Sequence, residues 1–150
     1  MTPRKINPPH YFLLALLLDV ALWRAPWLAI DVLPEPWRWL GVLPIAIGVG
    51  LAFAGAGRFS RAGTNIVPLT KSSALVTEGP FRFTRNPMYL GMTLVLVGVA
   101  FLANRPLPWL VVPIFIAILW LRFVRHEETL MEETFGDAYR AYRARVRRWL

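Results

Sequence analysis

The sequence contains no cysteine and only two histidines, His10 and His126. Without cysteine, the chain can form no disulfide framework, no thiolate metal site and no cysteine nucleophile. The scarcity of histidine argues against a zinc site built from imidazoles. Acidic residues are also few, nine against seventeen lysines and arginines, so the net charge is +8. We therefore predict no metal site, which leaves carboxylates, arginines and aromatic rings as the groups able to carry chemistry.

Apolar residues are abundant instead, at 56% of the 150 residues, compared with about 45–50% in soluble domains. They form blocks close to the roughly 20 residues that cross a bilayer core. We expect an all-α fold, a single membrane domain over residues 1–150 that is a bundle of about four transmembrane helices. The expected segments are helices at about 11–30, 39–57, 88–103 and 107–124, a cytoplasmic loop at 58–87 and a cytoplasmic helical tail at 125–150. The first block is expected to be a retained helix and not a signal peptide, because Arg24 and Pro26 follow it where small residues would mark a cleavage site.

Basic residues are distributed unevenly between the two sides of such a bundle. Fourteen fall on the side that holds the N-terminus, the 58–87 loop and the tail, and three, Arg24, Arg38 and Arg105, fall on the other. The positive-inside rule places the more basic side in the cytoplasm. We therefore predict a protein of a bacterial-type inner membrane with cytoplasmic N- and C-termini. Because the basic residues flank apolar blocks, we expect membrane lipids and not nucleic acid as partners.

The tail changes character along its length, beginning acidic and ending basic, which suits the dipole of a helix. Gly136 interrupts it, so we expect two short helices. Glu127 and Glu128 follow the fourth block directly, and two carboxylates there would bind a cationic group or act as a base. A solvated helix start would carry the same pair, so this alternative stays open.

The segment before the third block, LVTEGPFRFTRNPMYLG, is polar and rich in turn residues. Pro87 suits the first turn of a helix, and free N–H groups there, with Arg82 and Arg85 nearby, predict an anion site. Basic residues at an ordinary membrane helix start would show the same pattern. Asp19, inside the first block, is a functional candidate as an intramembrane carboxylate, unless it is partnered or wetted near a helix end. Glycines at positions 41, 48, 50, 55 and 57 predict close helix packing.

Two of these segments resemble a known family. GPFRFTRNPMYLG is similar to the "G-x-[YF]-x-x-x-R-[HN]-P-x-Y-x-G" segment of the isoprenylcysteine carboxyl methyltransferase and phospholipid methyltransferase group, and HEETLMEETFGDAYRAYRARVRRWL is similar to that group's tail. Both occur in the family's order, separated by a helical hairpin, and together they cover about half of the chain. The resemblance implies a membrane-embedded methyltransferase that uses S-adenosylmethionine without a Rossmann fold.

The resemblance also implies which residues hold the cofactor, since in the family it lies between the two motifs. By motif position these are Arg85, Asn86, Pro87, Tyr89, Gly91, His126, Glu127, Glu128, Tyr139 and Tyr142. Arg85 and Glu128 are the expected catalytic residues: Arg85 would orient a carboxylate acceptor, and Glu128 would serve as the base for an amine or a thiol. The expected acceptor is hydrophobic or lipid-linked, either an isoprenylcysteine-type carboxylate or a phospholipid amine, and the choice between them stays open.

Two other functions remain as alternatives. Membrane reductases of the sterol-reductase type use NADPH and share an R-[HN]-P-x-Y-x-G-like segment, but their tails read closer to K-Y-G-x-x-W-x-x-Y than to the sequence here. A non-enzymatic small membrane protein would explain the helices and Asp19, but it would not explain the paired motifs.

Overall fold

The computed structural model describes residues 7–26, 30–63 and 73–150, and these residues form helices and connecting turns without a strand. The helices are α1 (Pro8–Trp23), α2 (Val42–Arg61), α3 (Pro87–Ala103), α4 (Pro108–Leu119) and α5 (Arg125–Arg145). Short 3-10 turns, Trp37–Gly41 and Gly79–Arg82, come before α2 and α3, and a π-helical turn, Trp120–Val124, joins α4 to α5. The prediction of an all-α fold is confirmed.

The ends of the first two helices differ from the expected ones. α1 begins at Pro8, because two prolines suit a first helical turn, and it ends at Trp23 and does not continue toward residue 30. Residues 27–29 of the expected helix lie outside the described part of the chain. α2 continues to Arg61, past the expected end at residue 57, so the loop begins later than predicted. Residues 64–72 of that loop also lie outside the described part.

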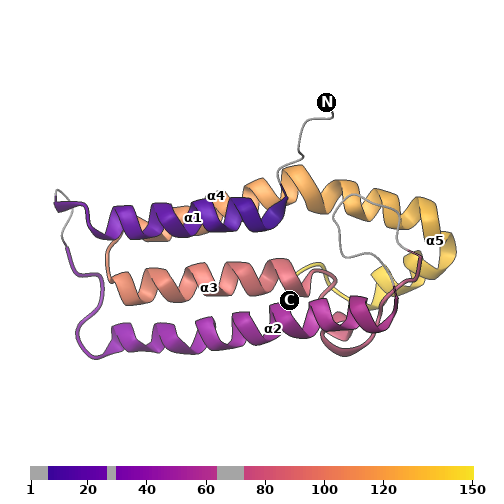
Figure 1. Cartoon of the computed structure of the whole chain (residues 1–150), viewed down its shortest axis with the longest axis horizontal. Coiled ribbons are helices and arrows are strands. Elements are labelled where there is room, and N and C mark those ends of the chain that lie inside the picture. Colours follow the sequence, from indigo (N-terminus) through magenta and orange to yellow (C-terminus); the bar gives the residue numbers. More distant parts are fainter. Residues whose placement is uncertain (1–6, 27–29, 64–72) are drawn as a thin grey trace.

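The first four helices run alongside one another, and α5 lies beyond one end of the bundle (Figure 1). α3 packs against α2, α4 and α1, and α1 also packs against α4. The start of α3 and the end of α4 therefore lie at the same end of the bundle, next to α5 (Figure 1). This topology brings the segment before α3 and the tail together, although more than 30 residues separate them in sequence.

Glycines set the close approach of α2 and α3. A β-carbon built on Gly91 would lie 2.5 Å from the carbonyl oxygen of Gly48, and one on Gly98 would collide with the carbonyl oxygen of Gly41. The prediction of close packing is confirmed for Gly41, Gly48 and Gly55, each of which lies against α3. It is wrong for Gly50 and for Gly57, where an added β-carbon would meet open space.

The outer surface of the bundle is apolar. Leu14 of α1 and Phe53 of α2 are 64% and 75% exposed. Large apolar side chains that are exposed in this way suit contact with lipid better than contact with water. Two helical segments, 37–61 and 108–145, are long and apolar enough to cross a membrane by length and composition, whereas α1 and α3 are apolar but shorter, at 16 and 17 residues. Membrane association is thus supported, and the four-span topology stays a prediction.

Asn104 organises the end of the bundle that is opposite to α5. It has a left-handed backbone, with φ of 52°, and it ends α3. Its side chain accepts a hydrogen bond from the Leu33 N–H (2.8 Å) and donates one to the Leu33 carbonyl oxygen (2.9 Å). Asn104 therefore stabilises the turn between α3 and α4 and the connection that precedes α2.

Candidate active site

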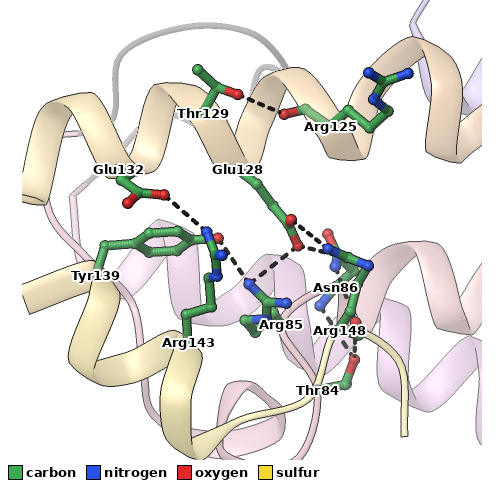
Figure 2. A network of polar contacts seen from close by, with 10 residues as sticks. All are labelled: Thr84, Arg85, Asn86, Arg125, Glu128, Thr129, Glu132, Tyr139, Arg143 and Arg148. Atoms are coloured by element: carbon green, nitrogen blue, oxygen red, sulfur yellow. Dashed lines mark hydrogen bonds and ion pairs between the residues drawn. The ribbon is translucent and has the colours of Figure 1, made fainter.

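An ion pair joins the segment before α3 to the tail. Arg85 Nη1 lies 3.2 Å from Glu128 Oε1, and the two side chains are only 8% and 13% exposed (Figure 2). Arg85 Nη1 also donates a hydrogen bond to Tyr139 Oη at 3.3 Å. One guanidinium thus contacts both halves of α5, and this is possible because α5 folds back on itself at Gly136, whose φ of 49° favours glycine. The prediction of two helices separated at Gly136 is confirmed.

A second arginine binds the same carboxylate from the end of the chain. Arg148 Nε and Nη2 donate to the two oxygens of Glu128 at 2.8 and 2.9 Å, a bidentate arrangement. The Arg148 guanidinium also lies over the Trp120 ring, 4.2 Å from its centroid. The hydrogen bonds to Glu128 raise the pKa of Arg148. Two cations therefore face one carboxylate, which leaves this cluster with a net positive charge.

Glu127 is held separately from Glu128, on a neighbouring face. Tyr89 Oη, at the start of α3, donates a hydrogen bond to Glu127 Oε1 at 2.7 Å. Burial raises the pKa of the Glu127 carboxyl, and the hydrogen bond from Tyr89 offsets part of that rise. The adjacent glutamates thus have different surroundings, since Glu127 contacts a tyrosine and Glu128 contacts arginines.

The two tyrosines of the second half of α5 have different partners. Burial raises the pKa of Tyr139, the charge of Glu128 adds to the rise, and Arg85 opposes it. Tyr142 is 4% exposed and donates a hydrogen bond to the Phe81 carbonyl oxygen at 2.7 Å. Burial raises the pKa of Tyr142 to about 12, and the charge of Arg85 opposes this rise. Tyr142 therefore fastens the turn before α3 to the tail, while Tyr139 belongs to the charged cluster.

The remaining candidates lie in three different places. Asn86 joins the cluster, because its Nδ2 donates to the Arg148 carbonyl oxygen at 3.0 Å, and Pro87 is the buried first residue of α3. Gly91 lies against α2, where its missing side chain permits helix packing. His126 is exposed, and among the described residues no hydrogen bond or ion pair joins it to the cluster. Eight of the ten candidates thus lie in or beside the polar cluster, whereas Gly91 packs against α2 and His126 is exposed at the start of α5.

A cleft opens beside Glu128, with a volume of about 270 Å³. The residues that line it include Trp120, Glu128, Glu132, Arg125 and Arg143. Aromatic and charged groups of both signs therefore meet at one opening. The described residues hold no group of three or more side chains suited to a metal ion.

Sequence reasoning missed Thr84, Trp120 and Arg148. Thr84 is 1% exposed and donates from Oγ1 to the Arg148 carbonyl oxygen at 3.1 Å. Arg148 is one of several arginines in the basic end of the tail, and nothing in their spacing distinguishes it. Trp120 lies in an apolar block, where an aromatic ring suggests only packing or a membrane interface.

Asp19 lies apart from this cluster, in α1. It is fully buried, and neither carboxylate oxygen has a hydrogen-bond partner among the described residues. Asp19 lies inside an apolar helix, as the sequence predicted, and it makes no contribution to the polar cluster.

Comparisons with known proteins converge on one family. Residues 36–138 match the phospholipid methyltransferase family. Over 63 residues, 42% of this chain, it is 43% identical to an uncharacterized protein of Haemophilus influenzae, whose whole length is covered. Over 79 residues, 51% of this chain, it is 32% identical to the protein-S-isoprenylcysteine O-methyltransferase of Schizosaccharomyces pombe, of which the match covers 32%. The family match contains Arg85 and Glu128, and it ends before the last twelve residues.

Proposed function

Because the chain belongs to the phospholipid methyltransferase family, we propose that it is an integral membrane methyltransferase that uses S-adenosylmethionine to methylate a hydrophobic or lipid-linked acceptor. The observation that carries this proposal is the buried contact between Arg85 and Glu128. It joins the two motifs, one from each side of the α3–α4 hairpin, into a single polar cluster at one end of an apolar bundle. The similarity to an isoprenylcysteine O-methyltransferase supports the same class of reaction.

The groups in the cluster fit the chemistry of this cofactor, which carries a carboxylate, an ammonium, a sulfonium and an adenosine. Arg85 Nε is a buried donor without a partner among the described residues, and a guanidinium is well suited to a carboxylate. Glu127 and Glu128 suit an ammonium group or ribose hydroxyls. The Trp120 ring at the cleft suits a sulfonium or a flat base. When bound, the cofactor would supply an electrophilic methyl group.

The residues of the chain would then mainly position the reactants. Holding two reactants in line can supply roughly 7–11 kcal/mol of the barrier. For a carboxylate acceptor, Arg85 would orient the nucleophile and no base is required. For an amine acceptor, Glu128 would accept the proton that the amine releases. An opening at the membrane surface suits an acceptor whose tail stays in the lipid while its head reaches the cluster.

The proposal also states which side of the membrane the site faces. S-adenosylmethionine is a water-soluble cytoplasmic compound, so the cluster should face the cytoplasm. Arg58, Arg82 and Arg125 lie near the same end of the bundle as the cluster, as the positive-inside rule requires of a cytoplasmic face. We therefore propose four spans, with both termini in the cytoplasm of a bacterial-type inner membrane.

The test is transfer of a labelled methyl group from S-adenosylmethionine into a total lipid extract by the purified protein. We expect labelled lipid with the wild type, and at least a hundredfold less with Arg85→Ala or Glu128→Gln. Arg82→Ala, which removes an exposed arginine three residues from Arg85, is the matched control and should keep full activity. If mild base releases the label, the product is a methyl ester. If the label is stable to mild base, the product is a methylated amine. Binding of NADPH without methyl transfer would overturn the proposal in favour of a reductase.

A further inference from the structure

The chain does not end with α5 but continues across the cluster. Val146 leaves the helix with an extended backbone, at φ −118° and ψ 127°, and residues 146–150 pass along the start of α3 (Figure 2). Trp149 packs against the hydrophobic core. We call residues 146–150 the C-terminal strap.

The backbone of the strap accepts hydrogen bonds from the segment GPFRFTRNPMYLG, residues 79–91, which we call the loop motif. The Arg147 carbonyl oxygen accepts a hydrogen bond from the Arg85 N–H at 3.0 Å. The Arg148 carbonyl oxygen accepts two more, from Thr84 Oγ1 at 3.1 Å and from Asn86 Nδ2 at 3.0 Å. Three consecutive residues just before α3 thus donate hydrogen bonds to the strap.

The Arg148 side chain of the strap binds the carboxylate of Glu128. Arg148 takes both oxygens of Glu128, and its guanidinium stacks on Trp120. A carboxylate beside an aromatic face is the usual protein environment for a cationic group. Arg148 therefore marks a cation subsite, formed by Glu128 and Trp120, and fills it with a group from the chain itself.

The two residues that Arg148 contacts also belong to the cleft. Glu128 and Trp120 both line it, and Arg148 is bound to the carboxylate of Glu128 and lies over the Trp120 ring. Displacement of Arg148 would uncover the polar edge of the cleft and free both oxygens of Glu128.

We propose that the C-terminal strap is an autoinhibitory segment, in which Arg148 competes with the cationic amino-acid end of the cofactor for the subsite of Glu128 and Trp120. This inference rests on the proposed function, because the competing ligand is S-adenosylmethionine. Ligand binding requires the closed strap to open, so the apparent affinity is lowered in proportion to the fraction of molecules that are open. The opposite arrangement, in which Arg148 helps to hold the ligand, predicts the reverse effect of its removal.

The test compares Arg148→Ala with Arg145→Ala, which removes the same charge from an exposed position whose side chain, among the described residues, hydrogen-bonds within its own helix. S-adenosylhomocysteine, titrated calorimetrically, should bind about fivefold to tenfold more tightly to Arg148→Ala than to the wild type, since a bidentate charged contact no longer has to break. The Arg145→Ala protein should bind like the wild type.

Limited trypsin digestion provides a readout that needs no ligand. Cleavage after Arg147 should be several-fold faster in Arg148→Ala than in the wild type, and saturating S-adenosylhomocysteine should accelerate it in the wild type. Unchanged or weaker binding by Arg148→Ala would overturn the competition while leaving the proposed function standing. Absence of binding by all three proteins would overturn the proposed function, and the competition with it.

Discussion

A double-mutant cycle on Arg85 and Glu128 tests whether the two motifs are energetically coupled. The atoms Nη1 and Oε1 lie 3.2 Å apart, and both side chains are nearly buried. At an effective dielectric constant of about 20, the Coulomb attraction at this separation is about 5 kcal/mol. Desolvation of both ions offsets most of that attraction, so we expect a net coupling of about 1–3 kcal/mol.

The cycle uses Arg85→Ala, Glu128→Gln and the double variant, with the free energy of unfolding measured by SDS denaturation in mixed micelles. Glu128→Gln should be the more harmful single change, because it leaves Arg85 buried without a counter-charge. In Arg85→Ala, the carboxylate of Glu128 keeps its bidentate contact with Arg148. Additivity within about 0.5 kcal/mol would show that the contact contributes nothing and would refute this reasoning.

Three further predictions concern single positions, each followed by unfolding in detergent. Burial raises the pKa of Glu127 above 4.5, so the folded state holds its proton more tightly and loses stability as the pH rises above 4.5. The stability of Glu127→Gln relative to the wild type should therefore increase between pH 4 and pH 8, and a constant difference would contradict this. Gly91→Ala should cost about 1–3 kcal/mol, because its β-carbon would lie 2.5 Å from a carbonyl oxygen, whereas Gly50→Ala, in open space, should be neutral or stabilising by up to about 1 kcal/mol; equal effects would exclude close packing as the cause. Tyr142→Phe leaves the buried Phe81 carbonyl oxygen without its donor and should cost about 1–3 kcal/mol, so an unchanged melting temperature would show that the bond is unimportant.

The parts of the structure that depend on local patterns were predictable from the sequence. Apolar blocks gave the positions of the helices, Pro87 marked the start of α3, and Gly136 marked the reversal within α5. The proximity of Arg85 to Glu128 followed from the order of the two motifs around a short hairpin. In each of these cases a residue type or a block length carries the information.

The parts that depend on tertiary contacts were not predictable. Gly91 belongs to the loop motif by position, but the rotation of α3 places it against α2. Arg148 is one of several closely spaced arginines in the tail, and the sequence does not distinguish it from the others. The path of the strap brings Arg148 to Glu128. The end of α1 at Trp23 was also missed, because the apolar block continues beyond Arg24 while the helix does not.

The central claim is that the loop motif and the tail form one cofactor site, and the direct measurement is calorimetric titration of S-adenosylhomocysteine into three proteins. These are the wild type, Asn86→Ala in the loop half and Glu128→Gln in the tail half. We predict saturable binding at one site in the wild type and at least tenfold weaker binding in both variants. Full affinity in either variant, or no binding by the wild type, would contradict the claim.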